Sequence, residues 1–275
     1  MPTGKMEGMT PPALVASDLD GTLLRTDRTV GARTLAALRR LGERGVPFVM
    51  VTGRPIRWLA EVIAQTGTPS ALTVCSNGAV IYDAAADRVV EHRPLAPELL
   101  ADVVGRLQDS YPDIAFAAET HDGLRHERHY PVAEVSPRVR PGELAELIAA
   151  PAIKLLARLD GAPDAVAEQM AASLYGVAEV TRSSHDCLIE ISAAGVTKAT
   201  GLAWVARRYG VAPEDIVAFG DMPNDLPMFG FVGHSVAMSN AEPAVRAAAD
   251  AVTASNDEDG LADYLDRLFA PAPID

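Results

Sequence analysis

The sequence predicts an α/β protein with a Rossmann-like parallel-sheet core that is interrupted by an inserted α+β domain. Short apolar runs alternate with segments whose leucines recur at helical spacing, both early and late in the chain. Such an alternation of strand and helix indicates a parallel sheet covered by helices on both faces. The middle of the chain mixes strand and helix patterns without that order. The core is therefore expected to be discontinuous in sequence.

The first core segment has the order strand, helix, strand, helix, strand. Its expected ranges are, in turn, Ala13–Ser17, Gly31–Arg44, Val46–Val51, Pro55–Gln65 and Ala71–Ser76. Gly45 stands where a helix would end, and Pro55 stands where one would begin. The pattern resumes late in the chain, with helices at Thr197–Tyr209, from Asn224 and at Gly260–Phe269, and strands at Asp215–Phe219, His234–Met238 and Ala249–Thr253.

The middle of the chain predicts a domain of its own. A hairpin is expected from Val80–Asp83 and Arg88–His92. Helices are expected at Pro97–Ser110, Gly142–Ala149 and Asp164–Tyr175, and strands at Ile114–Ala118, Ala152–Leu159, Ala178–Thr181 and Cys187–Ile191. The expected division is a core of residues 10–83 and 190–275 and an insertion of residues 84–189.

Composition excludes several classes of protein. The formal net charge of −13 argues against nucleic acid, which requires stripes of Lys and Arg. No apolar run approaches the roughly 20 residues of a membrane span, and Met1–Pro12 lacks the apolar stretch of a signal peptide. We therefore expect a cytoplasmic protein, monomeric or homodimeric, with Cys75 and Cys187 as reduced, buried thiols.

Polar residues follow three of the expected core strands. They are Asp18-Leu-Asp-Gly-Thr, Thr52-Gly53-Arg54, and Gly220-Asp221 with Asn224-Asp225, while Lys198 lies in the first turn of a core helix. Ligands of an open parallel sheet bind outside the carboxyl ends of its strands. These side chains are thus expected to meet in one crevice.

Four carboxylates in one crevice need a counter-charge. Two of them 4 Å apart repel by about 4 kcal/mol at an effective dielectric of 20. An all-oxygen set suits Mg²⁺, which together with Lys198 would neutralise a bound phosphate group. Of the first two carboxylates, Asp18 is suited to attack phosphorus, and Asp20 to give and take the proton. Thr52 can donate a hydrogen bond to a phosphate oxygen.

These ordered motifs resemble those of the haloacid dehalogenase superfamily. The resemblance is carried by Asp18-Leu-Asp-Gly-Thr-Leu-Leu, Val51-Thr-Gly-Arg, Lys198 and Gly220-Asp-Met-Pro-Asn-Asp. Thr-Gly-Arg, Ser76-Asn-Gly-Ala, Ala237-Met-Ser-Asn-Ala and Asn256-Asp-Glu-Asp-Gly are similar to its Cof-type branch. Ser239 departs from that pattern, where Gly is more usual, and only a local effect on the loop is expected.

The resemblance implies a role for each matching residue. Asp18 would be the nucleophile and Asp20 the general acid and base. Mg²⁺ would be held by the Asp18 side chain, the Asp20 backbone carbonyl and Asp221, with Asp225 in support. Thr52 and Lys198 would bind the phosphate group, and Asn224 would help to position it. The insertion would be a cap of the C2B type that closes over the substrate.

Other residues admit two interpretations. Gly53, Arg54 and Asn77 belong to the matching motifs and are candidates for binding the substrate or its phosphate, although an Arg near a helix start also forms structural ion pairs and Asn-Gly is a common turn. The cap histidines His121, His126 and His129 are expected in a solvated or substrate-facing loop rather than in a metal site. Arg182 and His185 have no clear assignment, and Trp58 and Trp204 are expected to pack in the core.

The function predicted from these observations is a Mg²⁺-dependent phosphatase that acts on a small phosphorylated metabolite such as a sugar phosphate. A phosphomutase of the phosphomannomutase type is the enzymatic alternative, because it resembles the same core and cap. A non-catalytic regulator that binds a phosphorylated metabolite is the third possibility. The full set of nucleophile and acid argues against that last reading, since a sensor needs neither.

Overall fold

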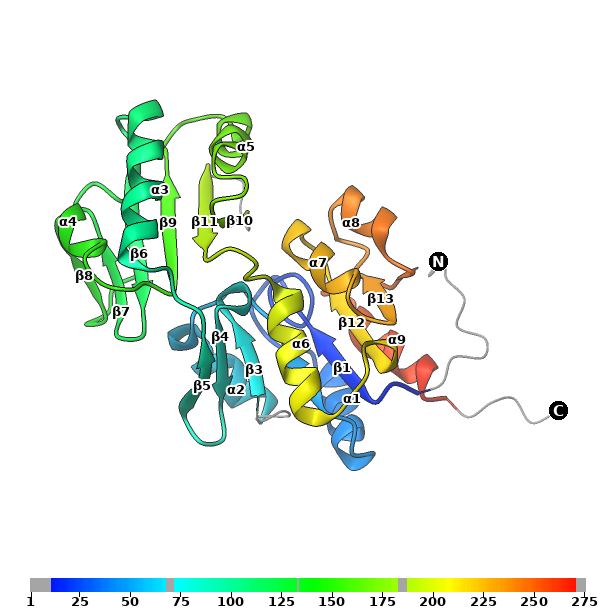
Figure 1. Ribbon diagram of the computed structural model, residues 1–275. Coiled ribbons are helices and arrows are strands. Elements are labelled where there is room, and N and C mark those ends of the chain that lie inside the picture. The colour runs from blue at the N-terminus through cyan, green and yellow to red at the C-terminus, as the bar shows by residue number, and fades with distance from the viewer. Residues whose placement is uncertain (1–10, 68–71, 133, 183–186, 271–275) are drawn as a thin grey trace. The chain divides into compact units, whose positions relative to one another are not determined.

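The computed structural model describes residues 11–67, 72–132, 134–182 and 187–270. The chain divides into two compact units (Figure 1). A core unit comprises the residues up to Val90 and those from Thr197 onwards, and an inserted unit comprises Glu91–Val196. The expected lead-in before Pro11, Ala71 of an expected strand, and the loop position His185 lie outside the described residues.

A five-stranded sheet with all strands parallel forms the centre of the core unit. The strands lie in the order β14 (Ala251–Val252), β13 (His234–Ala237), β12 (Ile216–Gly220), β1 (Leu14–Ser17) and β2 (Phe48–Met50). All residues of β1, β2 and β12 are buried, as expected for continuous apolar strands between two layers of helices. The predicted parallel α/β core is confirmed.

Six α-helices belong to the described part of the core unit: α1 (Ala32–Glu43), α2 (Ala60–Thr66), α6 (Lys198–Tyr209), α7 (Leu226–Phe229), α8 (Pro243–Ala248) and α9 (Gly260–Leu268). Helix α8 and the 3-10 turns η3 (Pro213–Asp215) and η4 (Pro223–Asp225) were not predicted as separate elements. Helix α6 packs on β3 and α7. It begins where Thr197 and Thr200 exchange side-chain to backbone hydrogen bonds, a capping arrangement that fixes the position of Lys198.

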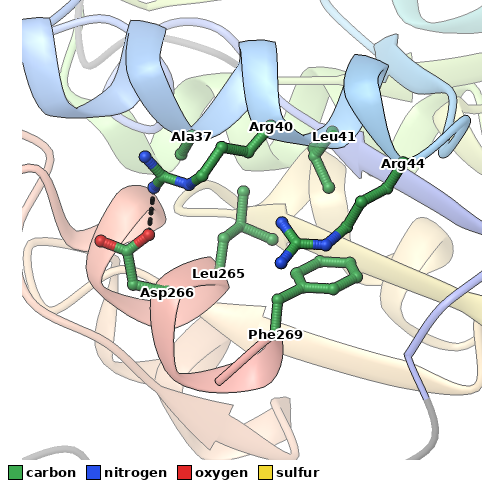
Figure 2. A pocket seen from close by; sticks show the side chains of 7 residues that line it. All are labelled: Ala37, Arg40, Leu41, Arg44, Leu265, Asp266 and Phe269. Carbon is green, nitrogen blue, oxygen red and sulfur yellow. Dashed lines mark hydrogen bonds and ion pairs between the residues drawn. The ribbon is translucent and has the colours of Figure 1, made fainter. Parts of the chain in front are cut away.

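Helices α1 and α9 pack side by side and enclose a small surface groove (Figure 2). Arg40 of α1 forms an ion pair with Asp266 of α9, and the Arg44 guanidinium lies 5.0 Å from the centroid of the Phe269 ring. None of the site residues predicted from the sequence lines this groove. We interpret it as a helix–helix contact whose rim is closed by arginines.

The strand expected third in the parallel sheet is only partly in that sheet. Strand β3 (Leu72–Cys75) touches it through one parallel bridge, Val51 with Val74, and Thr52 N–H donates to Val74 O at 2.8 Å. Otherwise β3 pairs antiparallel with β4 (Val80–Asp83), and β5 (Arg88–His92) completes a three-stranded sheet. The reversal occurs at η2 (Ser76–Gly78), where three successive residues have positive φ.

The helix expected over Pro55–Gln65 is broken into two pieces. A 3-10 turn, η1 (Ile56–Trp58), precedes α2, because Trp58 and Leu59 donate to carbonyls three residues back rather than four. Leu59 is buried, whereas Trp58 is 46% exposed and stacks under the Arg57 guanidinium. The expectation that Trp58 packs in the core is wrong. The same expectation is correct for Trp204, which packs against the hydrophobic core of the core unit.

The inserted unit has a six-stranded sheet in the order β10 (Glu179–Thr181), β11 (Leu188–Ser192), β9 (Lys154–Arg158), β6 (Ala115–Thr120), β7 (Gly123–His126) and β8 (Val139–Pro141). All neighbours are antiparallel except β7 and β8. Helices α3 (Pro97–Ser110), α4 (Leu144–Leu147) and α5 (Asp164–Ser173) share one apolar cluster with alternate sheet residues such as Phe116, Leu155 and Ile189. The predicted α+β insertion is thus present, with β7 and β8 as strands that were not predicted.

The units meet at borders that differ from the expected ones at 83/84 and 189/190. Strand β5 extends the β3–β4 sheet of the core unit through Val90. Strand β11, which an 189/190 border would cut, pairs along its length with β9 and β10. Strand pairing rather than hydrophobicity therefore sets the borders.

Both cysteines, Cys75 and Cys187, are buried free thiols, and burial raises the pKa of each. This agrees with the expectation of reduced structural cysteines. Across the described ranges, no helix is both long enough and apolar enough to cross a membrane.

Candidate active site

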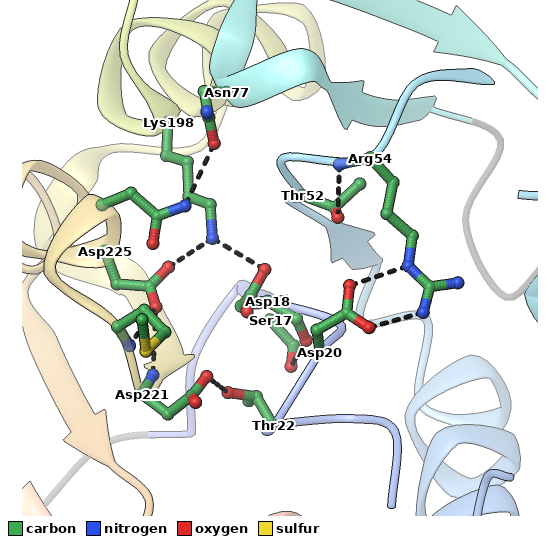
Figure 3. A network of polar contacts seen from close by, with 12 residues as sticks. Ser17, Asp18, Asp20, Thr22, Thr52, Arg54, Asn77, Lys198, Asp221 and Asp225 are labelled. Carbon is green, nitrogen blue, oxygen red and sulfur yellow. Dashed lines mark hydrogen bonds and ion pairs between the residues drawn. The ribbon is translucent and has the colours of Figure 1, made fainter. Parts of the chain in front are cut away.

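Three neighbouring parallel strands bring their polar ends together (Figure 3). Asp18 follows β1, Thr52 lies just past β2, and Asp221 follows β12. The Asp18 N–H donates to Phe219 O at 3.0 Å, which ties the end of β1 to the end of β12. The common edge of a parallel sheet is where such strands place their ligands, as the sequence analysis expected.

Lys198 lies at the centre of this group. Its Nζ contacts Asp18 Oδ1 at 2.7 Å and Asp225 Oδ1 at 2.6 Å, and the residue is 1% exposed. Burial alone would lower the pKa of Lys198, but the two carboxylates outweigh it and raise that pKa above its ordinary value. Lys198 is therefore a fixed ammonium ion next to Asp18.

Three carboxylates crowd around that single ammonium ion. Asp18, Asp221 and Asp225 are buried, and one oxygen of each lies within 4.8 Å of the others. Burial raises the pKa of Asp18 well above its ordinary value, with the charge of Lys198 opposing. Burial, and after it the charge of Asp225, raises the pKa of Asp221 to about 7. With all three carboxylates ionised, the cluster would carry more negative charge than Lys198 balances.

This donor set fits a hard divalent cation such as Mg²⁺, because all of its ligand atoms are oxygens and a further positive charge is needed. The Asp225 oxygens are already engaged: Oδ1 accepts from Lys198, and Oδ2 accepts from the N–H groups of Asp221 and Met222 at 3.0 Å. Asp221 Oδ1 accepts from Thr22 Oγ1 at 2.8 Å. Asp18 and Asp221 are thus better placed than Asp225 to hold a cation directly.

Asp20, expected as acid and base, does not join the buried carboxylate cluster. Its side chain is 58% exposed and accepts from Arg54 Nε and Nη2 at 2.7 and 2.5 Å. A metal contact through Asp20 would therefore come from its backbone carbonyl. The loop needs Gly21, because a Cβ there would lie 2.2 Å from Asp221 Oδ2 and φ is +73°.

The second-motif residues form a compact turn. Thr52 Oγ1 accepts from Arg54 N–H at 3.0 Å, and Asn77 N–H donates to Thr52 O at 3.0 Å. A Cβ on Gly53 would lie 3.1 Å from Asn77 Oδ1, a tight contact that the Asn77 side chain would have to relieve by shifting a few tenths of an ångström. Asn77 Oδ1 accepts from Asn224 Nδ2 at 3.1 Å. Asn224 Oδ1 is buried and has no hydrogen-bond partner among the described residues.

The comparisons with known proteins agree with this geometry. The family model described as haloacid dehalogenase-like hydrolase matches residues 15–265. The chain belongs to the haloacid dehalogenase-like hydrolases.

Relatives of this haloacid dehalogenase-like hydrolase match it over most of its length. The 5-amino-6-(5-phospho-D-ribitylamino)uracil phosphatase YitU of Bacillus subtilis is 34% identical over 95% of this chain and 99% of its own. A solved phosphatase of the superfamily from Bacteroides thetaiotaomicron is 28% identical, with a TM-score of 0.81, over 95% of this chain and 98% of its own. The hydrolase is therefore a phosphatase enzyme of this superfamily.

The fold of the Cof-type branch is also present. A solved sugar phosphatase described as subclass IIB of the superfamily has a TM-score of 0.78 at 22% identity and covers 92% of this chain and 97% of its own. At that identity the likeness concerns the fold alone. The resemblance to the Cof-type branch that the motifs carried is confirmed.

Several residues that hold the loop after Asp18 in this hydrolase were not predicted as site residues. Asn240 Nδ2 donates to Gly21 O at 2.8 Å, and Asn256 Nδ2 donates to Leu24 O at 2.9 Å. Asp259 pairs with Arg25, and Asp257 accepts from Thr26. The signal lay in the two late segments, Ala237-Met-Ser-Asn-Ala and Asn256-Asp-Glu-Asp-Gly, which are similar to the Cof-type branch.

The histidines and Arg182 of the inserted unit make local contacts. His121 Nε2 and His92 Nδ1 lie 2.7 Å apart in stacked rings, and His126 Nδ1 contacts Glu127 O at 2.9 Å. Arg182 forms ion pairs with Asp164 and Glu168. Among the described residues, no group of three ligands that could hold a metal includes a histidine.

Proposed function

We propose that this chain is a Mg²⁺-dependent phosphatase that hydrolyses phosphate monoesters of small metabolites through an aspartyl-phosphate on Asp18. The observation that carries the proposal is the Lys198 ammonium in contact with Asp18 beside a surplus of buried carboxylates. That arrangement places a nucleophile, a fixed cation and a cation-binding set at one strand edge. A structural ion pair would need no such surplus.

In the first half-reaction, an Asp18 carboxylate oxygen attacks the phosphorus atom and the bond to the ester oxygen breaks. Asp20 gives its proton to that oxygen, so the alcohol leaves neutral. Lys198 and Thr52 bind phosphate oxygens, and Asn224 positions the group from the Asn77 side of the site. In the second half-reaction, water attacks phosphorus, Asp20 takes its proton, and the bond to Asp18 breaks to release inorganic phosphate.

Mg²⁺ would be held by the side chains of Asp18 and Asp221 and by the Asp20 carbonyl, with Asp225 supporting from behind. When bound, it would neutralise phosphate charge and keep Asp18 and Asp221 ionised at neutral pH. The support for this assignment is the chemistry of the donors: oxygen atoms only, buried, and with more negative charge than Lys198 offsets.

The substrate class proposed is a small phosphorylated metabolite with hydroxyl groups. Support comes from YitU, which is named for a phosphoribitylamino-uracil. That name describes a phosphate ester of a polyol. The inserted unit is proposed to act as a cap of the C2B type. Hydrolysis is favoured over the mutase alternative because three relatives that match over 90–95% of the chain are named phosphatases.

The test is phosphate release from a panel of phosphoribityl, sugar and aryl phosphates, with Mg²⁺ or with EDTA. Wild type, Asp18→Asn and the matched control Asp109→Asn, an exposed aspartate of the inserted unit, would be compared. We expect Mg²⁺-dependent release in wild type and the control, and none in Asp18→Asn. If wild type releases no phosphate from any ester, the proposal fails. Transfer to a bisphosphate product would replace it with the mutase.

A further inference from the structure

Arg54 makes its closest side-chain contacts with Asp20. Two nearly parallel contacts join them, from Nε to Oδ2 at 2.7 Å and from Nη2 to Oδ1 at 2.5 Å (Figure 3). The hydrogen bond to Asp20 is also the main reason that the pKa of Arg54 is raised. The side chain of Arg54 is 13% exposed and that of Asp20 is 58% exposed. The arginine is therefore the fixed partner, and the carboxylate is the one that faces solvent.

The backbone of Arg54 is held on both sides. Its N–H donates to Thr52 Oγ1 at 3.0 Å, and its carbonyl accepts from Ser76 N–H at 3.0 Å. Ser76 lies in the positive-φ turn, and Asn77 of that turn donates from its N–H to Thr52 O. Since a two-point contact also fixes the guanidinium plane, Arg54 defines both where the Asp20 carboxylate lies and how it is turned.

The backbone of Asp20 is held, but the described contacts that fix its side chain come from Arg54. Asp20 pairs with Leu24 in a short bridge, and the next carbonyl, of Gly21, accepts from Asn240. The other carboxylates, Asp18, Asp221 and Asp225, form a separate buried group. Without Arg54, an exposed aspartate side chain is expected to sample several rotamers.

We propose that Arg54 is a positioning residue that aims the Asp20 carboxylate at the water that hydrolyses the aspartyl-phosphate, and that it is not a phosphate ligand. The inference rests on the proposed function. The two-point contact sets the direction of the Asp20 side chain, and in the second half-reaction that side chain takes the proton of the attacking water. There, the water oxygen bonds to phosphorus, its proton goes to Asp20, and the bond from phosphorus to Asp18 Oδ breaks.

The experiment is stopped-flow kinetics with p-nitrophenyl phosphate. Its leaving group departs without a proton, so formation of the aspartyl-phosphate does not need Asp20. In Arg54→Ala, we expect a burst of about one equivalent of nitrophenolate followed by slow turnover. The steady-state kcat should fall about 10–100-fold, part of the 10²–10⁴ that a general base supplies. KM should fall with kcat, which leaves kcat/KM close to that of wild type.

Three further variants make the result specific. Asp20→Asn should give the same burst, and adding Arg54→Ala to it should slow turnover no further, because the two residues act as one unit. Arg54→Lys keeps the charge without the two-point contact and should burst with a smaller loss of kcat. Arg57→Ala, an arginine three residues along the chain, should behave as wild type. Added guanidinium should speed the slow phase of Arg54→Ala only.

The opposite result is equally clear. If Arg54→Ala raises KM, shows no burst and lowers kcat/KM for every ester alike, Arg54 binds phosphate and the inference is overturned. A loss in Arg54→Ala that adds in full to that of Asp20→Asn overturns it as well. The burst itself reports a folded, reactive site, so misfolding cannot imitate the expected result. Failure of wild type on every ester would be a failure of the proposed function instead.

Discussion

Both units of the chain bury a lysine against carboxylates, yet the two arrangements differ in how the charges were brought together. In the inserted unit, Lys154 Nζ lies 2.6 Å from Glu190 Oε2, and Glu119 is its partner in the register of the adjacent strand. These are residues of regular strands in one sheet. In the core unit, Lys198 joins the ends of separate segments, with Asp18 lying 180 positions away in sequence.

The comparison teaches that a buried ion pair is by itself weak evidence for a site. Lys154 and Glu190 are 4% and 9% exposed, so their burial is close to that of Lys198. The core cluster differs because its three carboxylates come from loops and a turn that follow the ends of strands, rather than from regular strands. It is the only such group that could hold a metal within the described residues. Surplus charge at a strand edge, rather than burial, marks the site.

The largest expected effect separates the two lysines by activity. Lys198→Met should lower kcat/KM by about 10²–10³-fold or more, because a fixed cation is lost from the reacting phosphate. Lys154→Met should keep kcat near that of wild type, since nothing in the proposed chemistry uses it. The measurement is Mg²⁺-dependent phosphate release by both purified variants. Equal losses in the two variants would remove the distinction between a catalytic and a structural lysine.

The second effect separates them by stability. Lys154→Met leaves Glu190 buried without its cation and should destabilise the protein by about 3–5 kcal/mol. The double change Lys154→Met with Glu190→Leu should recover much of that loss, because two apolar side chains replace the pair. Urea unfolding of the whole chain, followed by circular dichroism, would measure it. A double variant as unstable as the single one would contradict this account of the pair.

The smallest effect concerns Mg²⁺ and pH. The pKa of Asp221 is raised to about 7 without a cation. Below pH 7, Mg²⁺ must therefore displace a proton from Asp221 in order to bind, and above pH 7 no proton has to be displaced. Because that one proton competes with the cation, Mg²⁺ binding should be about tenfold stronger at pH 8 than at pH 6. The same raised pKa means that ionising Asp221 costs stability as pH rises through 7, which Mg²⁺ should reverse.

Calorimetric titration of Mg²⁺ at both pH values, with proton release read from two buffers, is the measurement. Asp221→Asn should weaken binding and remove the part of its pH dependence that Asp221 contributes, while the part that Asp18 contributes through its own raised pKa should remain. Lys154→Met, whose ion pair has no part in the cluster, should keep both. Binding that is independent of pH in wild type would show that Asp221 is already ionised without the cation.

Much of the fold was predictable from sequence because its signals are local. Continuous apolar runs gave β1, β2 and β12, and helical spacing with caps gave α1, α3 and α6 close to their observed ends. Strands β7 and β8 escaped because they are short and rich in polar residues. Strand β3 was expected in the parallel sheet, and its main pairing depends on three positive-φ residues that no periodicity reports.

The location of the candidate site residues was predictable from the sequence, and the arrangement of their side chains was not. Every residue expected at the strand edge lies at or beside it, because strand ends of a parallel sheet converge whatever the details of the loops. The pairing of Arg54 with Asp20 and the engagement of both Asp225 oxygens were not predictable. Both depend on side-chain directions set by contacts far apart in sequence, such as Asn240 with Gly21.

The sequence by itself determined the class of fold, the residue types at each strand end and hence the kind of chemistry. These follow from hydrophobic periodicity and from the chemistry of single side chains, which neighbours in the chain suffice to express. Only the tertiary structure decided which carboxylates share Lys198, which one is turned toward Arg54, and where the units divide. Those outcomes depend on distances between segments up to 234 positions apart, such as Arg25 and Asp259, and packing alone sets such distances.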